Sequence, residues 1–152
     1  MLRLRRSTLA EIDRHAVESY PNECCGAVLA AEGDEIVRRI TNIQDRLHAE
    51  DPLKHPRAAR IAYFMDPKEL YAVLREADEE QRAIRLFYHS HPEHGAYFSE
   101  EDKARAMAWD EPAYPDVYYL VVSVVSRVVE NRLAVAWDDA RRDYVEVKLV
   151  VE

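Results

Sequence analysis

The chain is organised around one stretch, YHSHPEHGAYFSEED, which runs from Tyr88 to Asp102. It follows the run AIRLFY of residues 83–88, whose apolar and aromatic side chains are typical of a strand. It ends with Ser99 followed three residues later by an acid, a pattern typical of the first turn of a helix. The stretch therefore predicts a strand, a loop and a helix start, with two histidines where the strand ends.

The spacing of those histidines, His89 and His91, decides what they can do together. On a strand, residues two apart share one face at about 6.6 Å, so both imidazoles can lean onto one metal ion. On a helix they would lie about 200° apart and could not share an ion. The preceding apolar run and Pro92 both favour extended chain. Asp102 offers a third ligand, and such a set leaves one position open for water, as in catalytic zinc sites.

Each part of this pattern also has a simpler interpretation. Histidines in loops are commonly solvated or hydrogen-bonded, and Ser99 with Asp102 resembles a helix-capping box. The cap and ligand roles are compatible, because an acid at the third helical position can also face a neighbouring strand end. The residues alone leave a metal site and an ordinary capped helix as open alternatives.

The combination resembles the signature of the JAMM (MPN-plus) metalloproteases, in which His-x-His is followed after seven residues by Ser-x-x-Asp. The spacing in this chain shows no departure from that signature. The small stand-alone bacterial branch of the family typically also carries a glutamate in a Pro-x-Glu-x-Cys-Gly motif, and residues 21–26 read PNECCG. Two separated motifs in the right order make the resemblance more specific than either motif alone.

The resemblance implies a metal-dependent chemistry. One Zn²⁺ would be held by His89, His91 and Asp102, with a water molecule as the fourth ligand. By the same resemblance, Glu23 acts as the general base. Ser99 donates a hydrogen bond to the water or to the oxyanion. Manganese, iron or cobalt would accept similar ligands.

The resemblance also implies a fold and a substrate class. The fold is an α/β sandwich of the MPN/JAB, cytidine-deaminase-like type, in which a mixed, curved β-sheet is flanked by helices. The substrate is the C-terminal tail of a ubiquitin-like or sulfur-carrier protein, from whose terminal glycine an amino acid such as cysteine is released. Two alternatives stay open: a non-catalytic MPN scaffold, and a peptidase acting on cell-wall or phage-tail peptides.

Composition narrows the class of protein. The 152 residues, 48% hydrophobic and 33% charged, suffice for one domain, 1–152, with its own core. A formal net charge of −8 argues against binding to nucleic acid or to an anionic membrane. No apolar run reaches roughly 18 residues, and the basic residues 1–6 are not followed by the apolar stretch of a signal peptide, so we expect neither a membrane span nor export. The only cysteines, Cys24 and Cys25, are adjacent, which disfavours a disulfide and predicts a reducing, cytoplasmic location.

Hydrophobic periodicity and turn residues predict the remaining elements. We expect strands at residues 2–4, 23–30, 35–41, 117–125, 132–137 and 143–151, and helices at 9–19, 66–77 and 101–109. The first helix is expected to begin with a capping box at Thr8. Within it His15 is expected to be a surface or partly buried residue. Cys25 is expected to be a small buried residue, while the role of Cys24 stays open.

Residues 42–60 are rich in charge and proline and predict a long loop. By the family resemblance, this loop is a flap at the border of the substrate groove. A short strand is expected after it at 61–64. His48 and His55 in the loop are expected to be solvated. The same is expected of His94, for which a substrate contact is the alternative.

Overall fold

The computed structural model describes all residues, 1–152, and its centre is a sheet of six strands in the order β3-β2-β4-β7-β8-β9. These strands are β2 (Cys25–Ala31), β3 (Asp34–Ile40), β4 (Ala83–Pro92), β7 (Tyr118–Val125), β8 (Val128–Asp138) and β9 (Asp143–Val147). Only β4 and β7 are parallel neighbours. Parallel neighbours need a crossover connection, so the chain leaves the sheet after β4 and carries helix α4 (Glu100–Ala106) before it returns.

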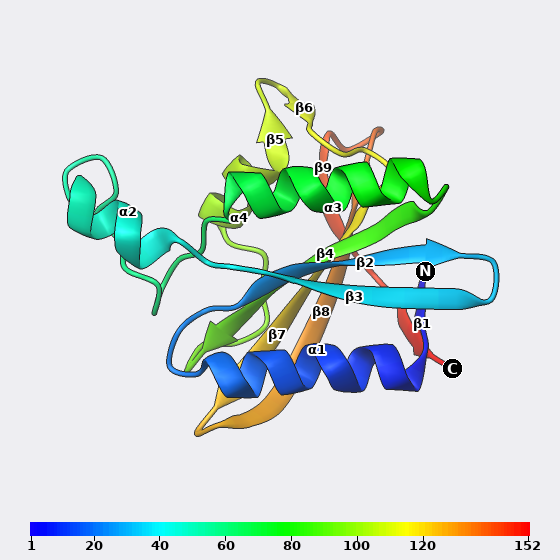
Figure 1. Cartoon of the computed structure of the whole chain (residues 1–152), viewed down its shortest axis with the longest axis horizontal. Helices are drawn as coiled ribbons and strands as arrows, with labels where there is room; N and C mark the ends of the chain where they lie inside the picture. Colours follow the sequence, from blue (N-terminus) through cyan, green and yellow to red (C-terminus); the bar gives the residue numbers. More distant parts are fainter.

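Helices flank this sheet, as Figure 1 shows. Helix α1 (Arg6–Ser19) contributes Ile12 to a core of 14 buried residues. Helix α3 (Pro67–Glu79) contributes Val73 to a second core of 13 buried residues. The expected mixed sheet flanked by helices is therefore confirmed. None of the helices has the length and apolar character needed to cross a membrane.

Strand β4 divides its side chains between the two cores and so positions the histidines. Leu86 and Tyr88 belong to the core that contains α1, whereas Phe87 belongs to the core that contains α3. Because successive side chains of a strand alternate between faces, His89 and His91 follow Phe87 onto the α3 side. The expectation that both histidines lie on extended chain is confirmed, since β4 runs on to Pro92.

The start of the first helix differs from the prediction. Helix α1 begins at Arg6, and its N-cap, Arg5, makes no side-chain capping hydrogen bond. Thr8 is buried inside the helix, 4% exposed, so the expected capping box at this residue is wrong. Helix α3, in contrast, has a regular cap, because the Asp66 carboxylate accepts hydrogen bonds from two backbone N–H groups of the first turn.

Residues 42–60 are more ordered than the predicted loop, because they contain helix α2 (Gln44–Glu50). The Asn42 side-chain oxygen accepts hydrogen bonds from the backbone N–H groups of Gln44 and Phe64, both at 3.0 Å. These bonds start the helix without the apolar periodicity that would reveal it in the sequence. The strand expected at 61–64 is absent, and only an isolated bridge pairs Asn42 with Met65.

The C-terminal part also differs from the prediction. The strand expected at 143–151 is divided at Lys148 into β9 and β10 (Leu149–Val151). Strand β10 pairs in parallel with β1 (Leu2–Leu4), so the chain ends lie near each other in Figure 1. Helix α4 stops at Ala106, short of the predicted Trp109, because β5 (Met107–Ala108) and β6 (Glu111–Pro112) form a small hairpin.

The glycine of the upstream motif, Gly26, is required by packing. It lies opposite Tyr88 in the β2–β4 ladder, and a Cβ atom at this position would collide with the Tyr88 ring. The ring cannot easily move, because Tyr88 is 1% exposed and its hydroxyl lies 2.7 Å from Nδ1 of His15. His15 is 9% exposed and therefore more buried than expected.

Replacing Gly26 by alanine is expected to lower the free energy of unfolding by about 1–3 kcal/mol, the usual cost of overpacking a core. Chemical denaturation measures this change. Gly95→Ala is the matched control, because a Cβ atom there has no neighbour within 4 Å. Equal, small effects of both substitutions would show that the Tyr88 ring adjusts without cost.

Candidate metal centre

Three ligand atoms from two elements meet at the end of strand β4. The Nε2 atoms of His89 and His91 lie 3.2 Å apart. Oδ2 of Asp102, from helix α4, lies 3.1 Å from the first and 3.3 Å from the second. A tetrahedral zinc ion with bonds of about 2.0–2.1 Å requires ligand atoms about 3.3 Å apart. The three atoms therefore fit one face of a zinc coordination tetrahedron.

Asp102 takes its position from the start of helix α4. Its backbone N–H donates to Oγ of Ser99 at 3.0 Å, and its Oδ2 accepts from the Ser99 backbone N–H at 3.0 Å. This is the complete capping box. The oxygen that closes the box is also the one that faces the imidazoles. The Asp102 carboxylate therefore both caps helix α4 and contributes an oxygen to the cluster of potential ligand atoms.

The histidine rings are held by their surroundings. Nδ1 of His91 lies 3.0 Å from the carbonyl oxygen of Gly95, which can only accept. Nδ1 therefore carries the proton, and a neutral ring presents its lone pair at Nε2, towards Asp102. His89 is stacked on Tyr63, with ring centroids 4.5 Å apart and an interplanar angle of 25°. Both rings are buried, so their orientation is set before any ion binds.

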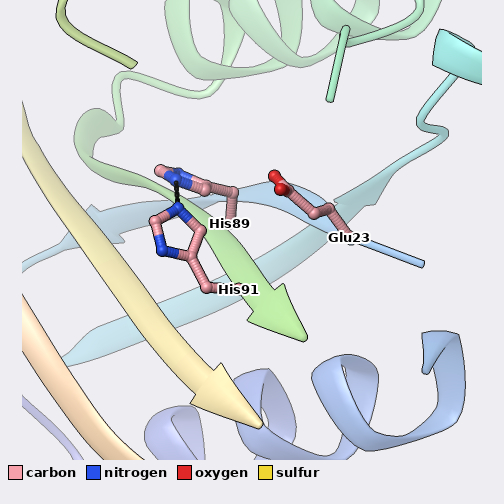
Figure 2. Close-up of side chains that lie close together, drawn as sticks. All are labelled: Glu23, His89 and His91. Carbon is pink, nitrogen blue, oxygen red and sulfur yellow. Dashed lines mark hydrogen bonds between the residues drawn. The ribbon is translucent and has the colours of Figure 1, made fainter. Parts of the chain in front are cut away.

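Glu23 lies two residues before the start of strand β2, and its backbone N–H and carbonyl are both hydrogen-bonded. Its N–H donates to the carbonyl of Ala59 at 2.8 Å, and its carbonyl accepts from Nδ2 of Asn42 at 2.9 Å. Figure 2 shows its carboxylate facing His89 and His91. One potential ligand atom from each of these three residues lies within 4.8 Å of the others. Two acids that are distant in the sequence, Glu23 and Asp102, thus lie beside the same pair of histidines.

The two acids are in different electrostatic states. Burial, reinforced by the nearby Asp102 carboxylate, raises the pKa of Glu23 to about 9. Burial alone would raise the pKa of Asp102 too. The hydrogen bond and charge of His89, with further hydrogen bonds from His91 and the Ser99 backbone, instead hold the pKa of its carboxyl well below its ordinary value. Asp102 is therefore anionic, as a metal ligand must be, while Glu23 can carry a proton. Acids separated in this way are typical of catalytic sites.

The comparisons with proteins of known sequence point to one family. The family model of prokaryotic homologs of the JAB domain matches residues 5–139. A desampylase of Haloferax volcanii is 33% identical over 128 residues, which cover 84% of this chain and 81% of the relative. A CysO-cysteine peptidase of Mycobacterium tuberculosis is 26% identical over 123 residues, which cover 81% of this chain and 73% of the relative. The chain belongs to the prokaryotic JAB family.

Solved structures show the same fold. Protein DSY2949 from Desulfitobacterium hafniense matches with a TM-score of 0.73 at 22% identity, covering 100% of this chain and 93% of its own. AF2198, a JAB1/MPN domain protein from Archaeoglobus fulgidus, matches with a TM-score of 0.54 at 15% identity, covering 99% and 98%. The resemblance deduced from the two sequence motifs is therefore confirmed, and the chain is an enzyme of the JAB/JAMM hydrolase family.

In this JAB-family chain a cavity of about 360 Å³ opens beside the cluster. Glu23, His91, Ser99 and Asp102 all line it, so the predicted base, the serine and two predicted ligands share one solvent-accessible space. His89 is only 1% exposed and contacts the other ligand atoms from within the fold. The cavity can therefore admit water and a polar substrate group to the predicted site residues.

The other histidines take different places. His94 is exposed at the cavity, its ring centroid 6.4 Å from that of His91. His48 and His55 do not line the cavity. Both are half-buried, and Nδ1 of His48 lies 2.7 Å from the His55 carbonyl, so they are solvated only in part.

Three further residues of the site had no sequence signal of their own. Tyr63 supports His89 by stacking, and Arg57 and Arg105 line the cavity. None belongs to a spaced motif, and the only relevant indication was the predicted flap at 42–60. Cys24 and Cys25 are both buried free thiols, which confirms the expectation for Cys25. Burial raises the pKa of Cys24 to about 12, so it is not a reactive thiolate.

Proposed function

We propose that this protein is a zinc-dependent hydrolase that cleaves the amide or isopeptide bond at the C-terminal glycine of a ubiquitin-like or sulfur-carrier protein. The observation that carries the proposal is the triangle of ligand atoms from His89, His91 and Asp102, with Glu23 facing the same cavity. The substrate class is supported by the two relatives, a desampylase and a CysO-cysteine peptidase. Zinc is supported by the spacing of the ligand atoms.

The proposed roles follow from position and protonation. His89, His91 and Asp102 would hold the zinc ion, which would supply a Lewis acid that lowers the pKa of water and polarises the scissile carbonyl. Glu23 takes a proton from the attacking water and delivers it to the leaving amine. The backbone hydrogen bonds of Glu23 fix its position beside the proposed ligands, and the positive charge of a bound zinc ion would lower the pKa that burial raises to about 9.

Ser99 is proposed to stabilise the oxyanion. Its Oγ accepts the hydrogen bond from the Asp102 backbone, and the serine lines the cavity. The hydroxyl proton therefore remains available for donation to a substrate oxygen. A single donor of this kind is worth about 2.7–4 kcal/mol of transition-state stabilisation.

A cytoplasmic location is also proposed. It rests on the two cysteines, which are free and adjacent, because reducing compartments preserve such thiols.

The proposal is tested by metal content and cleavage together. Protein purified without a histidine tag or added metal is expected to hold about one zinc per chain by elemental analysis. It is expected to release cysteine from a sulfur-carrier protein whose C-terminal glycine has been extended by cysteine. A chelator should abolish the release and added zinc should restore it, since the metal supplies the Lewis acid.

The His89→Ala variant is the control, and it should fold but bind no zinc. Folded wild-type protein that binds no metal after zinc addition would overturn the hydrolase proposal and favour the scaffold alternative. Zinc-dependent cleavage of cell-wall peptides but of no carrier protein would keep the chemistry and overturn the substrate class.

A further inference from the structure

Two arginines line the cavity beside the proposed zinc ligands, and they share a single acid. Nη1 of Arg57 lies 3.0 Å from one oxygen of Glu101, and Nη2 of Arg105 lies 3.2 Å from the other. Asp102 faces the imidazoles with its Oδ2. Taken alone, the two guanidiniums and the Glu101 carboxylate carry an excess of one positive charge, and Glu23 and Asp102 are the other acids that line the cavity.

The arginines are held in place by a buried glutamine. Gln44 is 2% exposed; its Nε2 donates to the carbonyl of Arg57 at 2.8 Å, and its Oε1 accepts from Arg105 at 3.4 Å. The next turn of chain is pinned as well, because the N–H of Ala59 donates to the Asp45 carboxylate at 2.7 Å. The Ala59 carbonyl accepts in turn from Glu23. The segment expected to be a flap is thus hydrogen-bonded directly to the backbone of the proposed base.

The two arginines differ in how free they are. The guanidinium carbon of Arg105 lies 5.0 Å from the ring centroid of Phe64 and 5.8 Å from that of Tyr63, and its side chain is 24% exposed. The Arg57 side chain is 53% exposed, and Glu101 is its only charged partner. Arg57 therefore has further N–H groups that can donate hydrogen bonds to a ligand in the cavity, whereas the Arg105 side chain is held by its neighbours.

Resting on the proposed function, we propose that Arg57 recognises the free α-carboxylate of a single amino acid joined to the carrier's terminal glycine. In hydrolysis the C–N bond after that glycine breaks, water supplies the oxygen of the new glycine carboxylate, and the amine leaves with a proton. In a terminal amino acid the carboxylate carbon is two bonds from that nitrogen, so both fit in one cavity of about 360 Å³. A lysine isopeptide within a protein has no free carboxylate at this distance, so it would give Arg57 no second anionic partner beside Glu101.

The test compares three synthetic peptides with the zinc-loaded enzyme. All end in the same carrier tail with two glycines. The first is extended by cysteine with a free carboxylate, the second by cysteine carboxamide, and the third is joined to the ε-amine of a lysine blocked at both ends. We expect kcat/KM for the carboxylate peptide to exceed that for the other two by roughly 10- to 100-fold, mainly through KM.

Arg57→Ala is expected to bring kcat/KM for the carboxylate and carboxamide peptides to within about twofold of each other, while its zinc content stays that of wild type. Arg57→Lys should retain part of the preference, because the charge remains and the forked geometry is lost. The matched control is Arg46→Ala, an arginine of α2 that pairs with Glu50 away from the cavity. Equal cleavage of carboxylate and carboxamide, or preference for the isopeptide, would overturn the inference and leave the hydrolase proposal standing. Cleavage of none of the three would overturn both.

Discussion

Replacing Asp102 by asparagine is expected to abolish zinc binding while leaving the fold intact. The asparagine oxygen can still accept the hydrogen bond from the Ser99 backbone, so the capping box of α4 survives in part. The negative charge that faces both imidazoles is lost, and with it one of the three proposed ligands. We expect zinc affinity to fall by at least about 100-fold, beyond the effect of losing an outer-shell partner.

Zinc titration against a competing chelator measures this loss, and circular dichroism with thermal unfolding checks the fold. Ser99→Ala is the matched control, since it removes the cap hydroxyl but keeps the carboxylate. It should cost about 1 kcal/mol of stability and retain zinc. If Asp102→Asn kept wild-type zinc affinity, the third ligand would have to be Glu23, which also approaches both histidines.

The site could be predicted from sequence to the extent that it depends on short-range patterns. His89 and His91 lie two apart on an extended strand, and Ser99 with Asp102 marks a helix start. Both patterns are set by local backbone geometry, so spacing alone reveals them. A capping pattern is not sufficient by itself, however. The same kind of pattern at Thr8 led to a wrong prediction, because the helix already begins at Arg6 and Thr8 is buried inside it.

The parts that sequence analysis missed depend on contacts between distant residues. Helix α2 is started by an Asn42 oxygen that also holds the backbone of Phe64, and its position is fixed by Gln44. Such polar contacts leave no hydrophobic period in the sequence. The division of the last strand is similar, because it depends on β1 offering an edge at the other end of the chain. Arg57 is likewise placed at the cavity by the hydrogen bond from Gln44 to its carbonyl, which no sequence pattern reveals.

Replacing Glu23 by glutamine is expected to leave zinc binding unchanged and to lower kcat by about 10²–10⁴-fold, the usual contribution of a general acid–base group. Glutamine has the same shape, and the backbone hydrogen bonds to Ala59 and Asn42 do not involve the carboxyl. It cannot, however, carry the proton from water to the leaving amine. Steady-state cleavage of the carrier substrate, with zinc content measured on the same sample, separates these two effects.

Glu18→Gln provides the control, because Glu18 is an exposed acid of helix α1 that pairs with Arg39. Its replacement should leave turnover unchanged. A Glu23→Gln enzyme that kept most of its turnover would remove Glu23 from proton transfer. A Glu23→Gln enzyme whose zinc content fell by the same factor as its turnover would show that the Glu23 carboxylate is a metal ligand. Because Asp102→Asn and Glu23→Gln test the two acids around one histidine pair, opposite outcomes for zinc content would assign one acid to the metal and the other to the proton.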